Sequence, residues 1–172
     1  MLRKVNNMTD FVKEVEKLMQ LPKGYCKACG KCCEIATARN CLTYEELLKV
    51  AKGETNAPLD VVISANDFLE TFVPFETIDE ARKVNAHFVD MILNTKNKSK
   101  NEITFFHCRY LKKDKKCQIY EDRPTFCRKY PVVDKRTFFF EGCGLEKVVK
   151  ENIKKVDEII NYLEQKEKNN GQ

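Results

Sequence analysis

The stretch Cys26-Lys27-Ala28-Cys29-Gly30-Lys31-Cys32-Cys33 places four thiols within eight residues. Gaps of two residues let a tight turn point successive sulfurs at one centre, as cysteines do around zinc and iron–sulfur clusters. Gly30 can adopt a positive φ and turn backbone N–H groups toward sulfur, and the two lysines can offset thiolate charge. The stretch therefore predicts a loop organised by a metal ion.

Cysteine use supports this interpretation. The chain has nine cysteines among 172 residues, and the residues after Met1-Leu2-Arg3-Lys4 are too polar for a secretory signal. We therefore expect a cytoplasmic protein, in which the reducing environment keeps cysteines as thiols. Thiols packed at two-residue spacing then indicate metal binding.

A second cysteine group begins with Cys108-Arg109-Tyr110-Leu111, continues through CQIYEDRPTFCRKYP at residues 117–131, and ends at Cys143. The runs CxxCGxCC, CxxL and CxIYxxRPxxCRxYP together resemble the CxxCxxCC family, also called YkgJ-type, of zinc- or iron-chelating proteins. Some members are described as iron–sulfur oxidoreductases. The IYxxRPxxCRxYP stretch is also similar to part of the flagellin lysine N-methylases.

Mapped onto this sequence, the resemblance implies eight metal ligands and leaves Cys41 outside the pattern. The implied ligands are Cys26, Cys29, Cys32, Cys33, Cys108, Cys117, Cys127 and Cys143. Arg123 and Arg128 flank Cys127 and are expected near the cofactor, where guanidinium groups balance thiolate charge and bind backbone carbonyls.

Several assignments stay open at this point. Eight thiolates could serve two mononuclear sites, two small clusters, or one cluster with additional redox thiols. Cys32 and Cys33 would point in opposite directions in extended chain, so we expect them in different sites unless one is a buried thiol. His107 could replace a thiolate, or it could pack in a β-prone aromatic run.

Apolar spacing predicts helices over residues 9–20 and 145–163, and hydroxyl–acid capping boxes at Thr43, Ser64 and Thr77 predict a helical insertion over 43–94. The polar tail, 164–172, is expected to fray. Two β-prone runs, 103–106 and 137–140, predict a short strand pair.

The predicted fold class is therefore mainly α: one small helical domain spanning 1–172, with a short β pair, organised around a cysteine-ligated metal centre. Both cysteine groups are expected to meet at that centre.

The leading functional hypothesis is an iron–sulfur cluster in a redox or electron-transfer role, because three cysteines at two-residue spacing can bind three corners of a cubane. The alternative is a zinc-stabilised protein-interaction module, and a third is the accessory cluster domain of a methyl-transfer enzyme. Nucleotide-binding and hydrolase motifs are missing, and any enzyme activity would be that of an iron–sulfur oxidoreductase. We expect an unknown redox or protein partner. No membrane span is expected, and a net charge of +5 does not indicate binding to nucleic acid.

Overall fold

The computed structural model describes residues 8–99, 101–131, 133–134 and 137–170. The chain forms two compact units. The sheet unit is Ala28–Phe126, and the helix-pair unit is Met1–Lys27 together with Cys127–Gln172. In the described part of the chain, every helix is too short or too polar to cross a membrane. That the whole chain is one domain stays a prediction.

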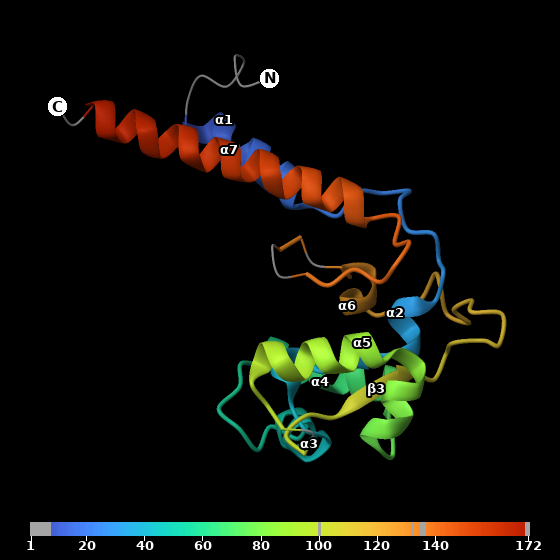
Figure 1. Ribbon diagram of the computed structural model, residues 1–172. Helices are drawn as coiled ribbons and strands as arrows, with labels where there is room; N and C mark the ends of the chain where they lie inside the picture. Colours follow the sequence, from blue (N-terminus) through green and yellow to red (C-terminus); the bar gives the residue numbers. More distant parts are fainter. Residues whose placement is uncertain (1–7, 100, 132, 135–136, 171–172) are drawn as a thin grey trace. The chain divides into compact units, whose positions relative to one another are not determined.

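Helices dominate both units, as predicted, and their order along the chain can be followed in Figure 1. The elements are α1 (Met8–Met19), α2 (Lys31–Glu34), β1 (Ala36–Thr37), the 3₁₀ turn η2 (Arg39–Cys41), α3 (Tyr44–Ala51), α4 (Leu59–Thr71), β2 (Phe72–Pro74), α5 (Ile78–Lys96), β3 (Phe105–Cys108), α6 (Thr125–Arg128) and α7 (Glu146–Asn170).

The sheet unit is built on a three-stranded antiparallel sheet with β3 at its centre. Ala36 of β1 pairs with Phe106, and Phe72 of β2 pairs with Cys108. Pro74 lies on β2, an edge strand, where a missing N–H breaks no ladder bond. The central strand is thus fixed on both sides, and Cys108 is its last residue.

Two of the predicted helix starts are confirmed in this unit. Thr43 and Glu46 form a capping box, with Thr43 Oγ1 accepting from Glu46 N at 3.2 Å and Glu46 Oε2 accepting from Thr43 N at 2.8 Å. Thr77 Oγ1 accepts from Glu80 N at the start of α5. The third predicted start is wrong, because Ser64 lies inside α4, which begins after Pro58.

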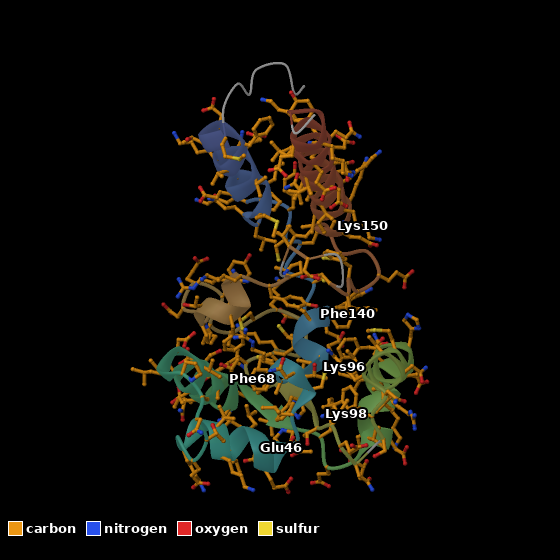
Figure 2. All side chains as sticks on the ribbon, turned by 90° about the vertical axis from the view of Figure 1, so that its left-hand side faces the viewer. Glu46, Phe68, Lys96, Lys98, Phe140 and Lys150 are labelled. Carbon is orange, nitrogen blue, oxygen red and sulfur yellow. The ribbon has the colours of Figure 1, made fainter. Side chains whose placement is uncertain are left out.

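Aromatic side chains fill the space between α4 and the sheet. Phe68, labelled in Figure 2, stacks on Phe72 at 4.7 Å between ring centroids and meets Phe106 edge-on at 5.1 Å. Phe126 closes the cluster, 5.8 Å from Phe68. Phe106 is fully buried. Burial of these rings stabilises the packing of α4 on the sheet.

The helix-pair unit packs α1 antiparallel to α7, side by side along most of α1 (Figure 1). Phe11, Leu18 and Ile159 are buried between them. Asn152 Nδ2 also donates to the carbonyl of Leu18 at 3.1 Å, which satisfies one of the last carbonyls of α1. The apolar faces predicted for these two helices therefore pack against each other.

Two expectations about the chain's second half are corrected. The β-prone run 137–140, which is described throughout, forms no strand, because turns hold it in place: Thr137 N donates to Asp134 O and Cys143 N to Phe140 O. The other predicted run, 103–106, overlaps β3, which pairs with β1 and β2 in place of the run 137–140. The tail does not fray from residue 164, since α7 continues through Asn170, and residues 171–172 lie outside the described part.

Candidate metal centre

Gly30 gives the cysteine loop its shape. It precedes α2 with φ 75° and ψ −10°, a left-handed conformation that costs glycine little. A Cβ at this position would overlap the carbonyl oxygen of Lys115 and lie 3.0 Å from Leu111 Cδ1. Lys115 also forms an ion pair with Glu34 of α2. The loop is therefore held tightly against the turn that connects Cys108 to Cys117.

Cys32 and Cys33 lie in helical chain, which changes how they can act. Both belong to α2, where neighbouring side chains diverge by about 100° instead of the opposite directions of extended chain. The expectation that they point apart assumed extended chain, and that assumption is wrong. Both thiols take part in one hydrogen-bonded group.

That group is a chain of three thiols, in which Cys33 hydrogen-bonds to Cys108 and to Cys32. The bond to Cys108, then the bond to Cys32, then burial raise the pKa of Cys33. The same bond lowers the pKa of Cys108 to about 7, against the opposing effect of burial. The pKa of Cys32 is lowered, chiefly by its hydrogen bond with Cys33 and further by the nearby charge of Arg123. We name Cys32, Cys33 and Cys108 the thiol cluster.

Arg123 is fixed beside the thiol cluster by its neighbour Tyr120. Arg123 Nε donates to the Tyr120 carbonyl at 2.7 Å, and its guanidinium carbon lies 3.7 Å from the centroid of the Tyr120 ring. The predicted bond to a backbone carbonyl is thus present, and the stacking on Tyr120 is an addition that sequence reasoning missed. Arg128 ends α6 and is exposed.

The other predicted ligands of the sheet unit are Cys29 and Cys117. Cys29 is exposed and follows Ala28, whose φ of 49° marks a sharp reversal of the chain. Cys117 is half-buried and pairs with Leu111 in an isolated β-bridge. Cys117 is therefore held by the same turn against which Gly30 packs.

Three predicted ligands belong to the helix-pair unit. They are Cys26, which is exposed, and Cys127 and Cys143, which are half-buried. Cys143 packs against Val133, Leu145 and Val149 at the base of α7.

Cys41 and His107 are not members of the thiol cluster. Cys41 is buried and contacts Thr37 Oγ1 at 3.9 Å. His107 alternates with Cys108 along β3, so its ring faces the other side of the sheet, 5.0 Å from Phe75. Of the two roles open to His107, the structure shows the second, packing on an aromatic ring.

The donor chemistry of the thiol cluster fits zinc or iron, both of which bind thiolate sulfur. Among the described residues, the side chains of His, Cys, Asp and Glu do not gather in threes around one point as a closed ligand set would. The cluster is arranged as a hydrogen-bonded chain. Sequence reasoning also missed the Glu34–Lys115 pair, whose only signal was opposite charge in two cysteine-flanking segments.

Comparison with known proteins gives one match. Residues 25–159 match the CxxCxxCC family model, described as "Putative zinc- or iron-chelating domain". The match covers most of the chain and every cysteine in it. Neither the curated proteins nor the solved structures gave a match.

Proposed function

The chain belongs to the CxxCxxCC family of zinc- or iron-chelating domains, and we propose that its cysteines bind an iron–sulfur cluster in an electron-transfer role. The observation that carries the proposal is the thiol cluster, in which Cys33 interacts with Cys32 and with Cys108, a residue of the second cysteine group. We further propose that the protein works in the cytoplasm with a redox partner protein.

The exposure of the thiols supports the cluster. The eight proposed ligands are twice what one tetrahedral zinc ion or one cubane cluster binds, so their number allows two centres of either kind. Cys26, Cys29 and Cys32 are exposed, so a cluster held by this loop would lie near the surface, within reach of a partner. When bound, such a cluster supplies one-electron transfer.

The chain's own residues would support this role in definite ways. Cysteine thiolates hold the metal, and the positive charge of Arg123 near Cys32 offsets the negative charge of the thiolates. The stacking of Arg123 on Tyr120 holds that charge in place, because it restricts the motion of the arginine side chain. Gly30 holds the loop against the turn that carries Cys117.

The alternative is a zinc-stabilised module that binds another protein. The family description includes zinc, and the half-buried Cys33 and buried Cys108 at the end of β3 are placed where a structural ion would connect α2 to the sheet. In this case the metal contributes to folding and performs no redox chemistry.

Anaerobic purification decides between the two. We expect a brown protein with broad absorption at about 400 nm and stoichiometric iron and acid-labile sulfide, as cysteine-ligated clusters show. The matched control is Cys33→Ser/Cys108→Ser, purified in the same way, which should be colourless. A wild-type protein that contains zinc and no sulfide under these conditions would contradict the cluster and support the zinc module.

A further inference from the structure

Gly144 is required for a close approach between two backbone segments of the helix-pair unit. A Cβ at Gly144 would overlap the carbonyl oxygen of Tyr25 and lie 3.2 Å from Lys27 Cγ. Its φ is not in the left-handed region, so the backbone conformation alone would accept any residue. Glycine is needed at position 144 because the two backbone segments approach each other too closely there for a Cβ.

Gly142, two residues earlier, needs glycine for the opposite reason. Its φ is 74°, and a Cβ there would meet nothing within 4 Å. Substitution at Gly142 therefore strains the backbone without disturbing a neighbour, whereas substitution at Gly144 forces two segments apart. The pair provides a matched control within one turn.

The crossing places one cysteine on each side of the contact. Tyr25 directly precedes Cys26, and Cys143 directly precedes Gly144, so each cysteine is one residue away from the contact. Cys143 is fixed there, because its N–H donates to Phe140 O at 3.0 Å and its carbonyl accepts from Glu146 N at 3.3 Å. Its side chain packs beside Leu145.

We propose that Cys26 and Cys143 are a ligand pair that binds the same metal ion or cluster, and that Gly144 is the residue that positions them. The proposal rests on the proposed function for the identity of the metal, but the pairing itself does not depend on it. Spacing in the sequence groups Cys26 with Cys29. The backbone crossing instead gives Cys26 a second neighbour from the far end of the cysteine pattern.

Thiol crosslinking tests the pairing without metal. The full chain, treated with chelator and reductant, is reacted with dibromobimane, which bridges two nearby thiols, and the bridged peptides are mapped by mass spectrometry. We expect a Cys26–Cys143 bridge that falls by about tenfold in Gly144→Ala, because an added Cβ forces the segments apart. Gly142→Ala should retain the bridge. Bridges from Cys26 only to other cysteines, or a bridge unchanged in Gly144→Ala, would overturn the pairing.

Cobalt binding tests the same pairing in the metal-loaded protein. Gly144→Ala should lower thiolate-to-cobalt charge-transfer absorption in the wild-type background and have no further effect in Cys26→Ser/Cys143→Ser, as a double-mutant cycle requires of coupled residues. An equal loss in both backgrounds would mean that Gly144 acts through folding alone and would overturn its positioning role. A chain that binds no metal would refute the proposed function, while the crosslinking result would still decide the pairing.

Discussion

The thiols of Cys33 and Cys108 interact, and this interaction is the first cause of the pKa shift of each, although residues 34–107 separate them in the sequence. The interaction links α2 to the end of β3 and therefore connects the first cysteine group to the second within the sheet unit. Because the Cys33 thiol also interacts with Cys32, removal of Cys33 should affect metal binding more than loss of an exposed ligand such as Cys29 would.

Serine in place of Cys108 should abolish most metal binding and weaken folding, because serine is a poor ligand for soft metals and the loss of metal removes folding free energy. Metal per chain by mass spectrometry, together with thermal unfolding, measures both effects. Cys41→Ser is the matched control, since Cys41 is also buried but is not a member of the thiol cluster. It should cost about 1–3 kcal/mol for a buried hydroxyl and leave the metal content intact.

Cys29→Ser and Cys127→Ser should each lower the metal content and the unfolding temperature, because each substitution removes one proposed ligand. Elemental analysis and calorimetry on the two variants provide the measurement. Intact metal in Cys127→Ser, with loss in Cys41→Ser, would show that the distal half of the ligand set is wrong.

Local signals in the sequence predicted the helices and part of β3, but not the other two strands of the sheet. Thr43 with Glu46, and the apolar spacing of α1 and α7, are contained in a few neighbouring residues, so their patterns can be read directly. β1 and β2 have two and three residues, too few for alternation to be visible, and their pairing partner is distant. Ser64 carried the same capping pattern as Thr43, yet the helix around it starts at Leu59, because one local signal does not fix a boundary.

The candidate site, like the fold, was predicted from the sequence only where the signal is local. Spacing predicted that the cysteines are metal ligands, since CxxC repeats are local. Spacing could not show that Cys32 and Cys33 lie in a helix, because that depends on the conformation of the chain after Gly30. The contact of Gly30 with Lys115 and that of Gly144 with Tyr25 join residues far apart in the chain, and only the fold shows them.

Gly30→Ala should destabilise the sheet unit more than a typical substitution at a positive φ. The left-handed conformation alone costs about 1–2 kcal/mol for a residue with a Cβ, and the overlap with the Lys115 carbonyl adds on the order of 1–3 kcal/mol. Gly53→Ala is the control, because Gly53 has φ 70° and open space around it. Urea unfolding of the two variants should differ by the overlap contribution. Equal losses would show that the turn moves freely.

Arg123 provides the last prediction, because its charge and its geometry can be separated. Its guanidinium stacks on Tyr120, bonds the Tyr120 carbonyl at 2.7 Å, and lowers the pKa of Cys32 as a minor cause after the Cys33 hydrogen bond. Arg123→Gln should weaken metal affinity by on the order of tenfold, as loss of a supporting residue around a metal typically does.

Arg123→Lys should recover only part of that affinity, since lysine keeps the charge but not the planar stack and the Nε–H bond. Competition with a chromophoric chelator measures the affinity, and the reduction potential of the loaded protein provides a second reading that a purely structural role would not move. Loss of the positive charge near a thiolate-bound cluster stabilises its oxidised, less negative form, so the potential of Arg123→Gln should fall while that of Arg123→Lys stays near wild type. If both variants unfold at lower temperature by the same amount and neither shifts the potential, Arg123 supports the turn and not the metal.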